Sequence, residues 1–323
     1  PHCKFLAVHV WIFVGKSAHP AIHFSPNPYL CMNPSTSDPN APMLIANPLY
    51  DTVFKYMMED NKVAKLFLSA LLGHEILELS FLPQELAADS DSSKPKKSRK
   101  AIRDTTGLSI YRLDFSARIR TEEGERQVII ELQKSKLKGD DLRFRRYLGK
   151  QYMNLNLFRF VASRQNYYKQ GIPIFPIFIL GEGLESFEEV PVVRVENCLY
   201  DRHTEERLEV EDAFVESLFH RGLVINVPAL KQRRRDELER LLSVFDQELQ
   251  HRSFHILNVH EEEFPERYRP IIRRLQSAVE SDDVRDWMNL EDEYLQEWNE
   301  TERELLQERT GREKAEKEAE EAR

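Results

Sequence analysis

Hydrophobic residues recur at helical spacing between residues 50 and 72. The apolar positions fall three or four residues apart, as they do along one face of a helix, and Gly73 follows as a stop signal. The sequence therefore predicts two helices, 50–59 and 61–72.

Two segments of alternating apolar and polar residues follow and predict a β-hairpin. Apolar side chains take every second position of 109–121 and again of 127–133, and EEGE between them supplies a turn. With the turn centred on Glu123 and Gly124, Phe115 lies opposite Leu132 and each apolar residue meets an apolar partner. A slip of one residue would oppose apolar and polar side chains, so the pattern favours this register.

The remaining pattern completes an α/β protein. The predicted elements are a helix at 140–156, strands at 172–180, 189–195 and 222–227, and helices at 229–251, 261–280 and 283–321. The last helix has no periodic apolar stripe, so charges of alternating sign four residues apart must support it. We expect a core at 47–230 that includes a mobile basic loop at 85–104, a helical part at 231–280 packed on this core, and a charged helical tail at 281–323.

Residues 1–46 differ from the rest of the chain, with seven of the 16 prolines and four of the 10 histidines. We expect an extension that does not belong to the folded core. Its apolar run at 5–15 is too short to span a bilayer, although a lysine before the run gives it a faint resemblance to a signal peptide. Five of its cysteines and histidines are candidate zinc ligands, but their spacings match no compact zinc-binding pattern; they are Cys3, His9, His19, His23 and Cys31.

The charge balance first argues against a nucleic-acid partner, since 46 bases face 55 acids and the net charge is −9. Residues 280–323 hold 17 acidic and 7 basic side chains, however, which leaves a net charge of +1 for the rest of the chain. Two basic runs lie there, at 94–103 and 134–150. Because fields act over about 10 Å in physiological salt, these runs can attract phosphate, or they are solvated surface. The three cysteines are too few for a disulfide framework and favour a reducing, cytoplasmic setting.

The hairpin register brings together polar residues that can hold a metal ion. Asp114 lies opposite Gln133 and diagonal to Glu131, at Cβ separations of about 5 and 7 Å. Mg²⁺, or Mn²⁺ in its place, takes oxygen ligands and needs only one or two protein carboxylates. Polar residues on a hairpin face can also be merely solvated. Ile129 on the same face favours a covered site, where paired carboxylates require a cation.

The helix at 140–156 adds candidate contacts to substrate. Its residues Arg143, Tyr147 and Gln151 step by four along one face, and Arg146 and Lys150 add positive charge.

Three blocks occur in order: NPLYDTVFKYM at 47–57, RLDFSARIRTEEGERQVIIELQKSK at 112–136, and RFRRYLGKQYMN at 143–154. Together they resemble the successive motifs of the PD-(D/E)XK nuclease family transposases, the recombination-promoting nuclease group of bacteria. The resemblance spans roughly residues 47–230. It implies an αβββαβ core, a mixed sheet flanked by helices, in which acids of the hairpin bind Mg²⁺ and the enzyme hydrolyses DNA phosphodiesters.

The same resemblance implies roles for individual residues. Asp114 and Glu131 match the motif acids, Gln133 takes the place of the motif lysine, and Asp51 matches an additional carboxylate near the metal. Tyr147 and Gln151 fall where the following helix orients substrate.

One departure concerns the motif lysine, because a neutral Gln133 cannot supply positive charge. The group that the chain resembles commonly has Gln there, so the change is compatible with activity. Lys134 points to the opposite face of an ideal strand. Lys55, one helical turn from Asp51, is an alternative cation and a further candidate contact to substrate.

The leading hypothesis is a Mg²⁺-dependent DNA endonuclease with Asp114, Glu131 and Asp51 as metal ligands and Gln133 positioning water. The rival is a catalytically degenerate protein of nuclease fold that binds DNA through its basic runs. In either case the C-terminal helices can join copies of the chain into a homo-oligomer, and no membrane partner is expected. No recognition helix stands out, so base specificity is not predicted.

Overall fold

The computed structural model describes residues 42–82, 110–122, 124–135, 141–162, 167–209, 212–231 and 233–321. The expected basic loop at 85–104, the basic run at 94–103 and the candidate zinc ligands of the N-terminal extension lie outside these ranges.

The helices α1 (Asp51–Glu59) and α2 (Asn61–Leu72) confirm the two predicted at 50–59 and 61–72. The carboxylate of Asp60 accepts the backbone N–H of Lys62 at 2.9 Å and so caps the start of α2. Gly73, with φ at 69°, ends α2 and donates its N–H to the carbonyl of Ser69. Tyr50, before α1, gives no such side-chain cap.

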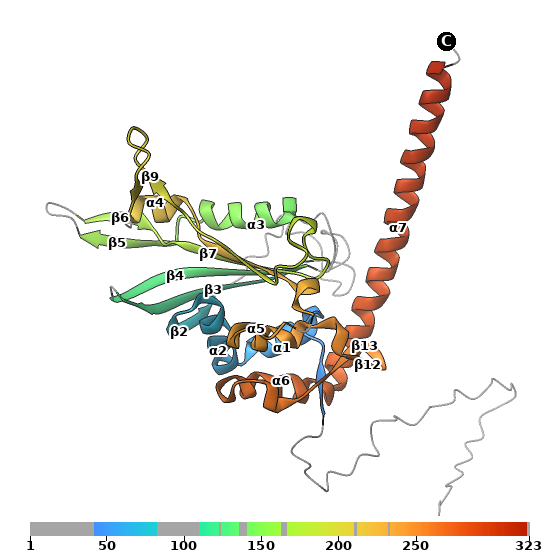
Figure 1. Ribbon diagram of the computed structural model, residues 1–323, viewed down its shortest axis with the longest axis horizontal. Coiled ribbons are helices and arrows are strands. Elements are labelled where there is room, and N and C mark those ends of the chain that lie inside the picture. Colours follow the sequence, from blue (N-terminus) through green and yellow to red (C-terminus); the bar gives the residue numbers. More distant parts are fainter. Residues whose placement is uncertain are drawn as a thin grey trace, which may run out of the picture. The chain divides into compact units, whose positions relative to one another are not determined.

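A mixed six-stranded sheet has the strand order β2-β3-β4-β7-β11-β8 (Figure 1). Three antiparallel strands come first in the chain: β2 (Glu75–Phe81), β3 (Ile110–Thr121) and β4 (Gly124–Ser135). Two strands then run parallel to β4, namely β7 (Ile174–Leu180) and β11 (Gly222–Asn226), and β8 (Val192–Val195) is antiparallel to β11.

The helix α3 (Asp141–Met153) connects the parallel neighbours β4 and β7, which need a crossover of this kind. In chain order α2, β2, β3, β4, α3 and β7 thus follow the sequence helix, three strands, helix, strand. This is the order that the family resemblance implies.

A hairpin of β5 (Phe158–Ala162) and β6 (Tyr167–Gly171) is inserted between α3 and β7. The hydrophobic pattern does not predict this hairpin, because FRFVA and YYKQG do not alternate strictly between apolar and polar residues. A second insertion, between β8 and β11, holds β9 (Leu199–Tyr200), β10 (Arg207–Leu208) and α4 (Ala213–Leu218).

Helices cover both faces of the sheet (Figure 1). The main hydrophobic core lies between the sheet and α1, α2 and α6 (Arg269–Val279), and it includes Phe115, Ile130 and Leu132. On the other face Ile129 packs with Ile174 and with Leu148 of α3. The expectation that the face bearing Ile129 is covered is confirmed.

The strand β1 (Met43–Ala46) corrects the boundary expected after residue 46. It pairs antiparallel with β13 (Ser253–Val259), which also pairs with β12 (Gln250–His251). Ile45 and Ala46 are fully buried. The folded core therefore begins before Asn47, and the partner strand lies more than 200 residues away, where no local pattern reveals it.

The single helix predicted at 229–251 is wrong. The structure has α5 (Glu237–Leu242) and three short 3-10 turns, η2 (Val227–Leu230), η3 (Ser243–Phe245) and η4 (Gln247–Leu249). Two aspartates explain the breaks. Asp236 accepts the N–H of Glu239 and starts α5, and Asp246 accepts the N–H of Glu248 and starts η4.

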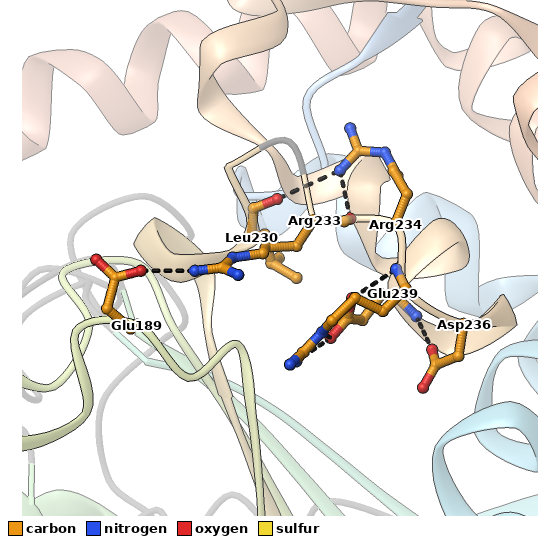
Figure 2. A network of polar contacts seen from close by, with 7 residues as sticks. Glu189, Leu230, Arg233, Arg234, Asp236 and Glu239 are labelled. Carbon is orange, nitrogen blue, oxygen red and sulfur yellow. Dashed lines mark hydrogen bonds and ion pairs between the residues drawn. The ribbon is translucent and has the colours of Figure 1, made fainter.

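Three consecutive arginines shape the segment before α5 (Figure 2). Arg233 pairs with Glu189 at 2.6 Å, and Arg234 donates to the carbonyls of Leu230 and Arg233. The buried carboxylate of Glu239 accepts the N–H of Arg235 at 2.9 Å and its guanidinium at 2.7 Å. These hydrogen bonds lower the pKa of Glu239 below its usual range.

The helix predicted at 261–280 is regular only as α6, after the turns η5 (Glu261–Glu263) and η6 (Glu266–Tyr268). Pro265 lies between these two turns and cannot continue a helix.

The helix α7 (Asp282–Glu321) confirms the helix predicted at 283–321. Its first turns are not a solvated tail, however, because Val284, Met288 and Glu291 are buried. From Glu300 onward every side chain that the structure describes is exposed. These three buried residues form a short row along the helix, and one of them is a carboxylate. The spacing of apolar residues in the sequence therefore does not reveal a buried face here.

None of the helices in the described part of the chain combines the length and the apolar composition needed to cross a membrane.

Candidate active site

The paired strands β3 and β4 place Asp114 directly opposite Glu131. The predicted register, with Asp114 opposite Gln133, is wrong by two residues: Thr121 already pairs with Gly124, so the turn is one residue earlier than expected. A shift of two keeps every residue on its predicted face. Phe115 meets Ile130 instead of Leu132, and since both partners are apolar the pattern cannot choose between the two registers.

The observed register favours two acids at one metal ion more than the predicted one does. Directly paired residues of antiparallel strands have Cα atoms about 4.5–5.5 Å apart, closer than a diagonal pair. Two carboxylic acids at one step of the ladder form a donor set that fits a hard divalent cation. The structure describes Asp114, Glu131 and Gln133 by their backbone, and their side chains are outside the described part.

The next residue of β4, Lys134, lies on the face that packs against α1. Its Nζ is 2.6 Å from Asp51 Oδ1, it also donates to the carbonyl of Leu49, and its side chain is only 1% exposed. The ring of Phe54 lies 6.0 Å away. A buried ammonium group requires such partners. Asp51 is therefore the counter-ion of a buried lysine.

Lys55, the alternative cation of the sequence interpretation, pairs with a different acid from Asp51. Its side chain is exposed and its Nζ is 3.9 Å from Glu59 on the same helix. The cation that the structure places beside Asp51 is Lys134.

The start of α1 is held by α7. Glu291 accepts the backbone N–H groups of Asp51 and Thr52, each at 2.8 Å. It replaces the cap that Tyr50 does not provide, and a carboxylate at a helix start also complements the helix dipole.

The neighbouring acid of α7, Asp292, accepts the hydroxyl of Tyr50 at 2.7 Å and lies 2.7 Å from Nε2 of His255. Burial, and then the hydrogen bond to Asp292, raise the pKa of the Tyr50 hydroxyl. The first helix of the candidate site is thus anchored at its start by the last helix of the chain.

The candidate contacts on α3 fall on different sides of that helix. Phe144 packs against Phe178, with ring centroids 5.0 Å apart, and Gln151 is 6% exposed, so this side faces the sheet. Arg146 and Lys150 are exposed, and Lys150 Nζ lies 5.8 Å from the half-buried ring of Tyr147. The Arg143 side chain is not among those described. The outer side of α3 therefore presents the positive charge.

Among the side chains that the structure describes, no three histidines, cysteines or acids come together as a metal site. Asp114 and Glu131 are not in that set.

Sequence reasoning gave no buried role to Lys134 and no role to Glu291 or Asp292. Lys134 carried a signal, because it continues the alternation of Ile130 and Leu132 and so places a charge on a core-facing position. Glu291 and Asp292 carried none, since they act on residues about 240 positions away.

No protein-family model, no curated protein and no solved structure matches this chain.

Proposed function

We propose that this protein is a metal-dependent DNA endonuclease of the transposase-associated PD-(D/E)XK type. The pairing of Asp114 with Glu131 carries the proposal, because it opposes two acids on the β3–β4 hairpin of a mixed sheet. The order of elements around that hairpin, from α2 to β7, supports it.

In this proposal Asp114 and Glu131 hold the ion, and the Gln133 carboxamide hydrogen-bonds the attacking water and orients it toward phosphorus. Mg²⁺, or Mn²⁺, supplies positive charge to the phosphate and lowers the pKa of water. Asp51 is left out of the ligand set because its carboxylate neutralises Lys134. Its role is to hold the start of α1 against β4, the strand that bears Glu131.

The outer side of α3 holds the DNA backbone in this proposal. Arg146 and Lys150 are exposed there, and contacts of this kind position DNA without reading its sequence. Arg143 of the same helix stays a predicted contact to DNA.

The test is nicking of supercoiled plasmid in Mg²⁺ or Mn²⁺ by the full chain and by Asp114→Asn and Glu131→Gln. Each variant should lose at least about 100-fold in nicking rate. Glu125→Gln is the matched control, because Glu125 lies on the same hairpin in an exposed pair with Arg118, and it should nick normally. Equal nicking by all four proteins would overturn the proposal.

A second candidate is a protein of the same architecture that binds DNA without cutting it. The burial of Lys134 favours it, since residue 133 is neutral and the adjacent lysine is occupied by Asp51. Retarded migration of a DNA duplex with the full chain, together with no nicking in either metal, would support this candidate over the nuclease.

A further inference from the structure

A cavity of about 420 Å³ lies at the turn end of the β3–β4 hairpin. Its wall at Ile119 is five residues along β3 from Asp114, about 16 Å at the rise of a strand. Its volume falls within the range of about 300–1,000 Å³ that is typical of small-molecule sites. The candidate active site does not include it.

Four arginines from four segments line this cavity: Arg126 of β4, Arg159 of β5, Arg194 of β8, and Arg221 just before β11. Four guanidinium groups around one hollow repel one another unless anions compensate them.

Two glutamates compensate three of these arginines. Glu216 of α4 lies 3.3 Å from Arg126 and 3.5 Å from Arg221. Glu196 lies 2.9 Å from Arg194 and 3.8 Å from Arg221. Among the described residues these three cations thus pair with two carboxylates, and a third acid of the wall, Glu122, is exposed.

Arg159 is the arginine for which the described residues provide no carboxylate. It donates to the neutral carboxamide oxygen of Gln170 over a long 3.4 Å, and its buried Nε has no hydrogen-bond partner within the described part of the chain. A guanidinium carries five N–H donors and binds phosphate or carboxylate in a bidentate manner. The cavity therefore has an unmet requirement for an anion at Arg159.

The rest of the wall combines apolar side chains with four polar residues, His74, Thr121, Glu122 and Gln127. Ile119 of β3, Phe175 of β7 and Leu223 of β11 line it, and Ile119 and Leu223 are otherwise buried in the main core. A ligand that satisfies both parts has an anionic group for the arginines and an apolar or aromatic body for this wall.

We infer that this cavity binds a phosphate monoester carried on an aromatic body, the chemical class of the nucleoside monophosphates. Phosphate matches the guanidinium of Arg159, and the rings of a base match the apolar wall. Glu196 and Glu216 are acceptors for the amino or hydroxyl groups of such a ligand. The inference does not depend on the proposed nuclease activity, because the two sites share no residue.

Calorimetric titration of the full chain with deoxyadenosine monophosphate tests the inference, with deoxyadenosine and inorganic phosphate as comparison ligands. The monophosphate should bind, and deoxyadenosine should bind at least about 10-fold more weakly because it lacks the charged group. Arg159→Gln should weaken the monophosphate at least about 10-fold. Arg207→Gln, at an exposed residue of β10 outside the cavity, should bind like the unaltered chain.

Oligonucleotides with and without a 5′ phosphate distinguish the source of the ligand. A preference for the phosphorylated end that Arg159→Gln abolishes assigns the cavity to strand ends, and binding of the free monophosphate alone assigns it to nucleotides. Asp114→Asn should bind the monophosphate normally, which separates this site from the nuclease. The inference is overturned if millimolar monophosphate does not bind, or if deoxyadenosine or Arg159→Gln gives equal affinity.

Discussion

Lys134 Nζ lies 2.6 Å from Asp51 Oδ1, and the lysine is 1% exposed whereas the aspartate is 24% exposed. Removal of the aspartate charge leaves a buried ammonium group without its counter-ion. We expect Asp51→Asn to lower the free energy of unfolding by roughly 3 kcal/mol in urea titrations. The double variant Asp51→Asn with Lys134→Met should cost less than the sum of the two single variants, because no uncompensated charge remains.

Lys55→Ala is the control for this pair. Lys55 belongs to the same helix, is exposed and pairs with Glu59 at 3.9 Å, so its removal should change stability by no more than about 0.5 kcal/mol. An Asp51→Asn variant as stable as Lys55→Ala would show that the buried pair contributes nothing.

Gln133 follows Glu131 by two residues along β4, so the two positions belong to the same face of the strand. If its carboxamide orients water, Gln133→Ala should lower the plasmid-nicking rate about 10- to 100-fold and leave the affinity for Mn²⁺ unchanged. Nicking assays and Mn²⁺ titration of the same preparation give both values. A variant that nicks at the unaltered rate would remove Gln133 from the mechanism.

Glu291 accepts two N–H groups at the start of α1. Glu291→Ala should lower the free energy of unfolding by about 1–3 kcal/mol, because both donors lose their buried acceptor. Hydrogen exchange of the Asp51 and Thr52 amides should accelerate more than that of amides in α2. The neighbouring exposed acid offers the control, since Glu293→Ala should leave exchange and stability unchanged.

Glu239 has a pKa below its ordinary value of 4.5 because the Arg235 side chain donates hydrogen bonds to its carboxylate. A lowered pKa in the folded state contributes stability above pH 4.5 that is lost as the pH falls through the folded-state pKa. Glu239→Gln should therefore be about 1–3 kcal/mol less stable than the unaltered chain at pH 7. The difference should shrink in urea titrations below pH 4.5, and a constant difference would contradict this account.

Truncation of α7 separates its two parts. Removal of residues 281–323 takes away Glu291 and the buried Val284 and Met288, so the product should unfold at lower temperature or fail to fold. Removal of 301–323 should leave the melting temperature within a few degrees, since the described side chains there are exposed. If the distal part joins copies of the chain, removal of 301–323 should be sufficient to lower the number of chains in each particle. Light scattering would show this as a fall in mass larger than the deleted residues account for.

The parts of this fold that could be predicted are those with a local signal. The spacing of apolar residues and the stop at Gly73 identify α1 and α2, and strict alternation identifies β3 and β4. Alternation fixes the face of the sheet on which a residue lies, but it repeats every two residues. The observed register, with Asp114 opposite Glu131, therefore could not be distinguished from the register shifted by two residues, with Asp114 opposite Gln133.

The remainder depends on partners that are distant in the sequence. β1 is four residues long and is a strand because β13 pairs with it. The helix predicted at 229–251 does not form as one helix, for a local reason that the spacing of apolar residues does not show. The carboxylates of Asp236 and Asp246 each accept a backbone N–H and so begin a new helical segment.

Glu291 is 240 residues away in the sequence from Asp51, whose N–H it accepts. The strand that pairs with β1 begins only at Ser253. A ribosome makes the N-terminal segments first, so they emerge long before their cap and their partner strand exist. The nascent chain must hold Leu49, Val53 and Phe54 in a form that avoids aggregation until the C-terminal third is released. Folding of this protein should therefore be completed only after nearly the whole chain has been translated.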